Sequence, residues 1–248
     1  MASVAMILCA GYGTRLGAMT RDTPKPMLEI AGAPLLEHTV RHLARLGISD
    51  LIINLHHRPE AITSHFGDGA RLGVSISYLL EESLLGTAGA VKNAAHLLDD
   101  VDHLLVLYGD VLCSEDYRDL LAAHTQNERA SCTLVVHQRS GSNSVVEMDA
   151  EHRIVHFQER PPAGPANAAP CWVNSGLYCC SRRLLDRVPR GAVVDFPRDI
   201  FPGLVAEGAL YGFPLRGYRC AVDSPERLAQ ARADLVGRDP FAAPRGKS

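Results

Sequence analysis

The sequence predicts a single-domain α/β protein, in which helices flank a Rossmann-like mixed sheet whose strands are mostly parallel. Through the first half, short apolar runs alternate with helical patterns, and the runs are apolar at successive positions. Such runs are typical of parallel strands, because helices cover both faces of the sheet. In the second half, strand-like runs are separated by short polar turns, which makes the predicted sheet mixed.

The elements of the first half follow in order. VAMILCA predicts a buried strand, and PLLEHTVRHLARLG predicts a helix with Pro34 at its start and Gly47 after its end. LIINLH and VSISYLL predict two further strands. TAGAVKNAAHLL then predicts a helix, and HLLVLYGD predicts a strand that is apolar along most of its length.

In the second half, strands are predicted for SCTLVVH, SVVEMD, RIVHFQER and CWVNSGLYCC. RRLLDRV predicts a short helix, and FPRDIFPGLVAEG is expected to be helical in its later part. SPERLAQARADLVG predicts a last helix with Ser224 as N-cap, Pro225 at the first position and Gly237 as its stop. Because no repeat or linker interrupts the chain, we expect one domain over 1–237 and a flexible tail over 238–248.

Composition argues against several classes of protein. A formal net charge of -3 over 248 residues disfavours general nucleic-acid binding, which normally needs a basic face. We expect no secretory signal, and no apolar run approaches the ~20 residues of a membrane helix. The seven cysteines are odd in number and include no CxxC pair, so a cytoplasmic location fits best. The histidines offer no convincing set of metal ligands.

A glycine-rich loop, AGYGTRLG, follows the first predicted strand. Gly17 lies one residue too far along for a dinucleotide fingerprint, and no G-K-[ST] follows to make a P-loop. Glycines still let backbone N–H groups approach phosphate oxygens. Arg15 can grip a phosphate with its planar fork, and Lys25, between Pro24 and Pro26, can act as a directed point charge. The spacing alone leaves two interpretations open, phosphate binding and a tight turn with solvated side chains.

Two aspartates follow apolar runs. Asp110 ends LLVLYGD, and the carboxyl ends of strands are where ligands bind in open α/β sheets. Asp223 lies in RCAVDSPERL, just before the last predicted helix. Carboxylate oxygens suit the divalent cation that accompanies bound phosphates. Each aspartate has a purely structural alternative, as a turn residue or as part of a helix start.

Taken together, these segments resemble the sugar-1-phosphate nucleotidylyltransferases. LCAGYGTRL and TPKPMLEIAGAPLLEH resemble the signature loop of that family and the segment that follows it. LLGTAGAVKNA, YGD, FQERP, VNSGLY, DIFPGL and DSPERL match in order, so the resemblance extends from about Val4 to about Leu235. Within the family the chain is similar to mannose-1-phosphate and heptose-1-phosphate guanylyltransferases, and muramate-1-phosphate uridylyltransferases are also close.

The resemblance implies that a sugar 1-phosphate attacks the α-phosphorus of a nucleoside triphosphate, with GTP favoured, and that pyrophosphate leaves. It implies catalytic roles for Arg15, Lys25 and Asp110, with Mg²⁺ held by Asp110 and Asp223. It assigns nucleotide binding to the part at about 1–125 and sugar binding to the part at about 126–237. The implied nucleotide-binding residues are Ala10, Gly11, Gly13, Thr14, Glu81, Gly86 and Thr87, and the implied sugar-binding residues are Ser144, Glu159 and Asn174, with Arg160 where the family usually has lysine. Assembly into a homo-oligomer is left open.

Two departures from the family pattern bear on these roles. Where the family usually has DIGTP, this chain reads AVDSP, so that Ala221 takes the usual place of the metal aspartate and Asp223 follows two residues later. Related cytidylyltransferases carry an xDTPED arrangement, which keeps Asp223 as a candidate ligand. Asn143 and Ser144 stand where relatives often have Tyr-Gly, which leaves the sugar open.

Three functions compete. The first is an Mg²⁺-dependent transferase, using GTP or, alternatively, a uridylyl, adenylyl, cytidylyl or thymidylyl donor with another sugar 1-phosphate. The second is a weakly active family member that binds a nucleotide sugar and regulates a partner, an idea motivated by Ala221. The third is an oxidoreductase with a dinucleotide cofactor, which the glycine spacing disfavours.

Overall fold

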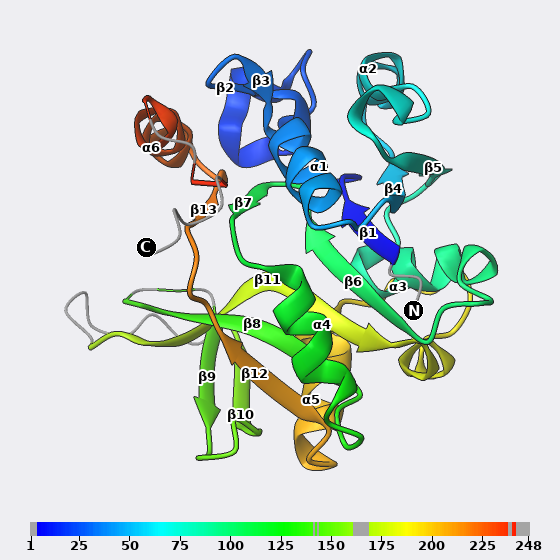
Figure 1. Ribbon diagram of the computed structural model, residues 1–248, viewed down its shortest axis with the longest axis vertical. Helices are drawn as coiled ribbons and strands as arrows, with labels where there is room; N and C mark the ends of the chain where they lie inside the picture. The colour runs from blue at the N-terminus through cyan, green and yellow to red at the C-terminus, as the bar shows by residue number, and fades with distance from the viewer. Residues whose placement is uncertain (1–3, 141, 143, 161–168, 238–239, 242–248) are drawn as a thin grey trace, which may run out of the picture.

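Figure 1 shows the computed structural model, which describes residues 4–140, 142, 144–160, 169–237, 240 and 241. In this part of the chain the main sheet has nine strands, in the order β10-β9-β11-β6-β1-β4-β5, with β8 paired to β11 and β12 paired to β8. Its strands are β1 (Val4–Leu8), β4 (Asp50–Leu55), β5 (Ser75–Leu80), β6 (His103–Tyr108), β8 (Cys132–Arg139), β9 (Ser144–Met148), β10 (Ile154–Glu159), β11 (Cys171–Ser181) and β12 (Leu210–Pro214).

The first half forms the parallel part of the sheet, since β6, β1, β4 and β5 all run in the same direction. Met6 and Ile7 are adjacent on β1 but belong to two different hydrophobic cores, one on each face. Burial on both faces explains why this strand is a continuous apolar run. The predicted α/β class with a mostly parallel, mixed sheet is confirmed.

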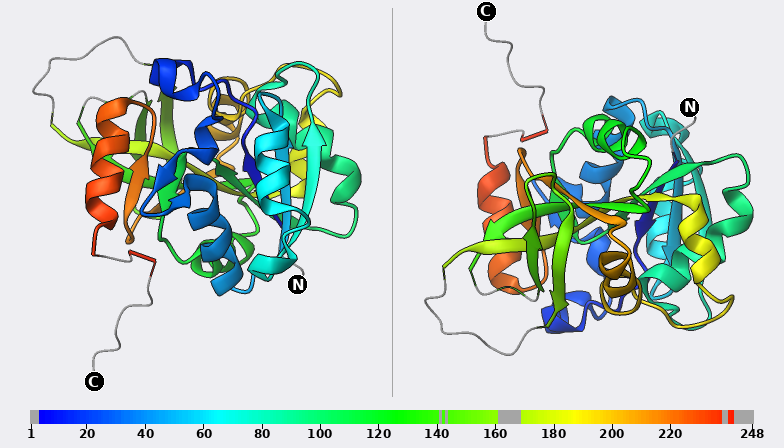
Figure 2. Two further views of the ribbon diagram at one scale, coloured as in Figure 1. Left: turned by 90° about the horizontal axis from the view of Figure 1, so that it is seen from above. Right: turned by 90° about the horizontal axis from the view of Figure 1, so that it is seen from below.

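Helices cover both faces of the sheet. The core on one face includes residues of α3 (Gly86–Asn93) and α5 (Phe201–Ala206). The core on the other face includes residues of α1 (Leu35–Arg45), α2 (Pro59–Phe66) and α4 (Tyr117–Thr125). In the left view of Figure 2, α1 and α4 lie on one side of the sheet and α5 lies on the other.

The second half adds the antiparallel strands. β11 pairs with β6, and β8 and β9 pair with β11, all in antiparallel register. β10 and β9 form an antiparallel hairpin, whereas β12 runs parallel to β8. The strands predicted with no helix between them therefore form the antiparallel side of one continuous sheet.

A small ribbon joins the two halves. β7 (Val111–Cys113) pairs in antiparallel register with β13 (Arg219–Ala221), and α6 (Pro225–Leu235) follows. Ser224 caps α6, because its Oγ accepts a hydrogen bond of 3.3 Å from the Arg227 backbone N–H. A third core packs this ribbon and α6 near β2 (Glu29–Ile30) and β3 (Ala33–Pro34). It includes Phe241, whereas most of the predicted tail lies outside the described residues.

Several short elements have no counterpart among the predicted ones. These are helices α2 and α4 and strands β7, β12 and β13, of which β7 and β13, at three residues each, are too short to give a clear periodicity. The predicted helix at 182–188 is a 3₁₀ turn (Arg182–Arg187), and a turn of π-helix (Phe196–Ile200) precedes α5. Within the described residues, no helix is both long and apolar enough to cross a bilayer.

His124 connects α4 to the sheet through hydrogen bonds. Because this histidine is buried, we expect the fold to be sensitive to acid. Its Nδ1 lies 2.9 Å from Thr133 Oγ1 on β8, and its Nε2 lies 3.2 Å from Ser181 Oγ on β11. Burial, together with the nearby His103, lowers the pKa of His124 to about 4. The unfolded chain therefore binds more protons than the folded one between that pKa and the usual value near 6.5, so stability falls as the pH drops through this window.

Because of His124, we expect the free energy of unfolding to be about 2 kcal/mol lower at pH 5 than at pH 7. Urea unfolding of the wild type and of His124→Gln at both pH values measures this difference. The pH dependence should shrink in His124→Gln and stay as in the wild type in His96→Gln, which changes an exposed histidine. Equal pH dependence in all three proteins contradicts the assignment.

Candidate active site

The site lies where the carboxyl ends of β1, β4, β5 and β6 meet. The chain leaves β1 toward β4 on one side, while β6 pairs with β1 on the other, so the strand order reverses at this point. Ligands bind at such switch points in open α/β sheets. A cavity of about 310 Å³ opens there. Its lining includes Ala10, Gly11, Gly13, Thr14, Arg15, Lys25, Glu81, Gly86, Thr87 and Asp110, which are all of the predicted nucleotide-binding and catalytic residues.

The glycine loop folds back against Lys25. Gly13 has φ +66°, and its carbonyl accepts hydrogen bonds of 3.0 Å from Leu16 N and 3.0 Å from Thr20 Oγ1. A Cβ at Gly13 would lie 3.1 Å from Lys25 Cβ, so glycine is needed both for its backbone conformation and for close packing. The loop continues into 3₁₀ turns (Thr14–Thr20) that are interrupted at Gly17 and, as the spacing predicts, opens no α-helix.

Two ion pairs connect this loop region with the aspartates. Lys25 Nζ pairs with Asp110 Oδ2, and the Lys25 side chain is only 10% exposed. Arg15 Nη1 lies 3.2 Å from Asp223 Oδ2, with 66% of the Arg15 side chain exposed. The first pair is thus held in a shielded position, whereas Arg15 is free of close packing and accessible to a ligand.

The β7–β13 ribbon brings the two aspartates to one place. Ala221 pairs with Val111, and Val222 N donates a hydrogen bond of 2.8 Å to the Asp110 carbonyl. Asp110 and Asp223 both line a second cavity of about 410 Å³ that adjoins the first. Ala221 lines the same cavity, so the position at which the resemblance leads one to expect a metal aspartate also faces the site.

The second cavity contains the predicted sugar-binding residues Ser144, Glu159 and Asn174. Asn174 is held in place, because its backbone N–H donates to Ser144 Oγ at 3.0 Å and its Nδ2 donates to Tyr178 Oη at 3.0 Å. Burial raises the pKa of Glu159. Tyr108 lines both cavities, as do Arg15 and Asp110. Asn143 lies outside the described residues.

The nucleotidyl transferase family model matches residues 4–231, a span that includes all of the residues lining the two cavities. This chain belongs to the nucleotidyl transferase family. Together with the mannose-1-phosphate guanylyltransferases among its relatives, this match confirms the predicted membership among the sugar-1-phosphate nucleotidylyltransferases and the predicted enzyme class.

Curated relatives of this transferase include mannose-1-phosphate guanylyltransferases. The protein from Mycobacterium tuberculosis is 37% identical over 247 residues, covering 98% of this chain and 67% of the relative. The catalytic subunit beta from Dictyostelium discoideum is 31% identical, covering 90% of this chain and 61% of the relative. The chain thus spans about two thirds of the length of these relatives.

Solved structures share the fold of the transferase. A putative glucose-1-phosphate thymidylyltransferase from Bacillus anthracis superposes with a TM-score of 0.83 at 21% identity, covering 99% of this chain and 98% of that one. HddC from Yersinia pseudotuberculosis, solved in complex with GMP-PN, gives a TM-score of 0.79 at 23% identity, covering 95% and 100%.

The structure adds site residues that the sequence pattern does not single out. Asn54 accepts from Cys9 N at 2.8 Å and donates to Glu81 Oε1 at 2.7 Å, which fixes the Glu81 carboxylate in the nucleotide cavity. Leu85 N donates to Glu81 Oε2 at 3.1 Å. Asn54 lies near the carboxyl end of a predicted strand, and this position is the only signal that could have marked it.

One part of the second cavity is basic. His137, Arg139 and Arg219 line it, and the Arg219 guanidinium donates to the Ser175 carbonyl at 3.0 Å. Burial, followed by the nearby charges of Arg219 and Arg139, lowers the pKa of His137 to about 4. His137 is therefore neutral at physiological pH, and the positive charge of this part comes from the arginines.

We expect Asp110→Asn and Asp223→Asn each to lower kcat/KM by at least about 100-fold. Asp110 lines both cavities and Asp223 lines the second one, so each substitution removes a carboxylate from the place where the two substrates would meet. Circular dichroism melts should show a folded protein in both cases. Asp100→Asn, which changes an exposed aspartate, is the matched control and should keep wild-type activity. Wild-type activity of Asp223→Asn would mean that this residue only begins the last helix.

Lys25→Ala should lower kcat about 100-fold and raise KM for the triphosphate less, because the lysine contact strengthens as negative charge develops during transfer. Steady-state kinetics with varied triphosphate separates the two parameters. Arg21→Ala removes an exposed basic side chain and should leave both unchanged. A raised KM with unchanged kcat would make Lys25 a simple binding residue.

Proposed function

We propose that the transferase moves a guanylyl group from GTP to a hexose or heptose 1-phosphate in a reaction that needs Mg²⁺. The observation that carries this proposal is the pair of adjoining cavities that share Arg15, Tyr108 and Asp110. A nucleotide in the first cavity and a sugar phosphate in the second would meet at these shared residues. The cavities, of about 310 and 410 Å³, are of the size that small-molecule sites have.

In this reaction an oxygen of the sugar 1-phosphate forms a bond to the α-phosphorus of the triphosphate. The bond from that phosphorus to the bridging oxygen breaks, and pyrophosphate leaves with the electron pair. No nucleophile of the protein takes part, so positioning and charge stabilisation supply the catalysis. Lys25 and Arg15 are the cations placed to stabilise the phosphates, and Gly11 and Gly13 let backbone N–H groups approach them.

The residues at the ribbon fit Mg²⁺. Asp110 and Asp223 offer hard oxygen donors to one cavity, and they come from backbone segments joined by the hydrogen bond from Val222 N to Asp110 O. Among the residues that the structure describes, no group of three or more potential ligands gathers. Mg²⁺ commonly binds in this way, through one or two carboxylates with substrate phosphates and water completing the shell, and it neutralises charge on the phosphates when bound.

Glu81 supports guanine as the base. Glu81 lines the nucleotide cavity, and its carboxylate, which already accepts from Asn54 Nδ2 and Leu85 N, can only accept hydrogen bonds. Guanine presents N1–H and N2–H₂ donors on one edge, which match such an acceptor. The similarity to mannose-1-phosphate guanylyltransferases and the complex of HddC with GMP-PN support the same choice. Mannose 1-phosphate is accordingly the first acceptor to test.

All seven cysteines are free thiols, which supports the further proposal that the enzyme acts in the reducing cytoplasm.

The decisive experiment measures pyrophosphate release for each pair of nucleoside triphosphate and sugar 1-phosphate. We expect GTP with a hexose or heptose 1-phosphate to give the highest kcat/KM, and EDTA to abolish turnover. No turnover with any pair, despite measurable GTP binding, would favour a nucleotide-binding regulator instead, as Ala221 in the metal position suggests.

Glu81→Gln should lower kcat/KM for GTP about tenfold, because an amide N–H₂ then faces the donors of guanine. The value for UTP should change less, so the preference for GTP narrows. Glu82→Gln changes the exposed neighbour and should alter neither value. An unchanged ratio of GTP to UTP in Glu81→Gln would remove this residue from base selection.

A further inference from the structure

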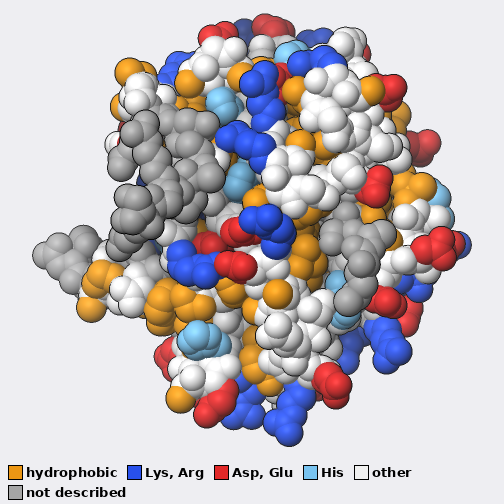
Figure 3. All heavy atoms as spheres, viewed as in Figure 1, with side chains coloured by type: hydrophobic (Ala, Val, Ile, Leu, Met, Phe, Trp, Pro, Cys, Tyr) orange, Lys and Arg blue, Asp and Glu red, His pale blue; other side chains and the backbone are white. Residues whose placement is uncertain are grey.

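A buried carboxylate lies at the far end of the ribbon that carries the two aspartates. Glu115 is only 3% exposed, although it sits close to the start of α4 beneath a charged surface. Figure 3 shows basic and acidic side chains adjoining near the middle of this face, where Figure 1 draws β7 and α4. Burying a carboxylate is costly unless hydrogen bonds and a counter-charge satisfy it. The hydrogen-bond partners of Glu115 therefore show which part of the chain this carboxylate holds in place.

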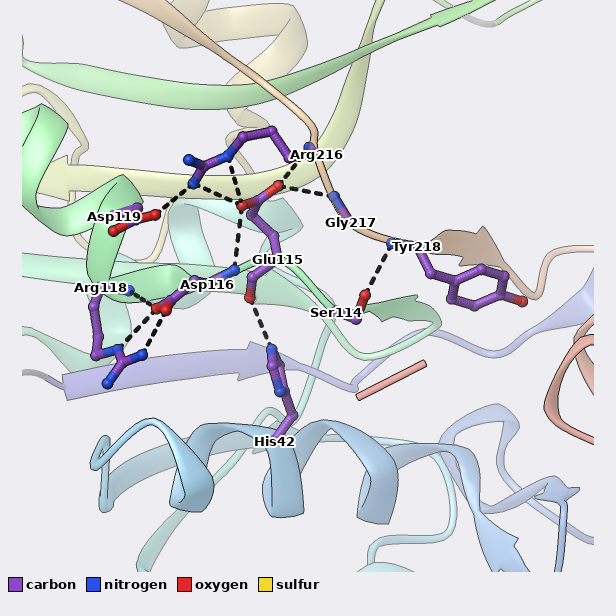
Figure 4. Close-up of polar contacts among 9 residues, drawn as sticks. All are labelled: His42, Ser114, Glu115, Asp116, Arg118, Asp119, Arg216, Gly217 and Tyr218. Carbon is purple, nitrogen blue, oxygen red and sulfur yellow. Dashed lines mark hydrogen bonds and ion pairs between the residues drawn. The ribbon is translucent and has the colours of Figure 1, made fainter. Parts of the chain in front are cut away.

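Figure 4 shows these partners. Glu115 Oε2 accepts from the backbone N–H groups of Arg216 at 2.6 Å and Gly217 at 3.2 Å. Glu115 Oε1 accepts from the Arg216 guanidinium at 3.0 Å, which also reaches the more exposed Asp119 at 2.6 Å. The Glu115 carboxylate therefore fixes the backbone of the linker between β12 and β13, and not only the Arg216 side chain.

The backbone on both sides of this contact is also constrained. His42 Nε2 on α1 donates to the Glu115 carbonyl at 2.8 Å, which anchors Glu115 to the rest of the domain. A Cβ at Gly217 would lie 2.9 Å from Glu115 N and 2.9 Å from the carbonyl carbon of Ser114. The linker thus passes so close to Ser114 and Glu115 that only glycine fits at 217.

From this anchor the pairing runs without interruption to the reaction centre. Ser114 exchanges two hydrogen bonds of 2.9 Å with the Tyr218 backbone. The register of β7 and β13 then continues to the pair Val111 and Ala221. The next hydrogen bond is the one from Val222 N to the Asp110 carbonyl, and Asp223 follows. The register of the pairing at one end of the ribbon therefore sets the position of each residue along it, as far as Val222.

We propose that Glu115 is a positioning residue that sets the separation of the Asp110 and Asp223 carboxylates through this ladder. The inference rests on the proposed function of these aspartates as metal ligands. With an amide at this position only one acceptor oxygen remains, so either the linker N–H groups or the Arg216 guanidinium lose their acceptor. Strand β13 can then shift against β7, which moves Asp223 relative to Asp110. Glu115 touches neither cavity, so it acts only through the ribbon.

The test uses Glu115→Gln, which keeps the size of the side chain and removes its charge. Asp119→Asn is the matched control, because it removes the other partner of the Arg216 guanidinium and leaves the linker backbone untouched. Binding of Mn²⁺ alone to each protein, followed by electron paramagnetic resonance, reports on the aspartates without catalysis. Hydrogen exchange of the Val222 amide reports on the ribbon, and thermal unfolding on global stability.

We expect Glu115→Gln to weaken Mn²⁺ binding about tenfold and to speed exchange at Val222, while Asp119→Asn matches the wild type. Excess Mg²⁺ should partly restore kcat in Glu115→Gln. If Glu115→Gln does not fold, Gly217→Ala displaces the same linker and should weaken Mn²⁺ binding likewise. Gly203→Ala is the control for that variant, since a Cβ there meets nothing within 4 Å.

Two results would overturn the inference in distinguishable ways. Wild-type Mn²⁺ affinity in a Glu115→Gln protein with reduced thermal stability would make Glu115 a purely structural residue. The proposed metal site would then stand. A wild-type protein that binds no Mn²⁺, either alone or together with GTP, would contradict the metal site itself, and the positioning role with it.

Discussion

Strand β13 pairs with β7 immediately beyond the carboxyl end of β6, so that the hydrogen bond from Val222 N to the Asp110 carbonyl joins the last part of the chain to the middle of the sheet. The position of Asp223 in the site depends on this contact. It places Asp223 beside Asp110 and within 3.2 Å of Arg15 on the glycine loop. Because the two aspartates are 113 positions apart in sequence, their proximity exists only while this ribbon is paired.

The charged side chains of the site form two ion pairs between segments that are distant in sequence. The cations of the two ion pairs, Arg15 and Lys25, come from the segment after β1. The carboxylates, Asp110 and Asp223, come from the segments that directly follow β6 and β13. In the shielded pair, the Lys25 side chain is only 10% exposed, and the neighbouring Asp110 carboxylate limits the cost of burying it. The same cations are those that a polyphosphate would meet, so the site is already organised for negative charge before a ligand binds.

Much of this arrangement could be predicted from the sequence, because its signals are local. The continuous apolar runs identify β1, β4 and β6, and the spacing of Gly11, Gly13 and Gly17 excludes a helix-opening fingerprint. The predicted residues Glu81 and Thr87 indeed line one cavity with the loop. The grouping succeeded because the carboxyl ends of parallel strands meet at a single edge.

The parts that could not be predicted depend on contacts between distant segments. β7 and β13 are three residues each, too short for a periodicity, and their pairing decides how Asp223 reaches the site despite Ala221. On strand β13, Ala221 faces the second cavity with its small side chain, and Asp223 enters the same cavity two residues later, beyond the end of the strand. Because Asp223 lies beyond the end of β13, its position relative to Asp110 depends on the register of the ribbon. The buried Glu115 at the other end of that ribbon is the anchor that we propose for this register.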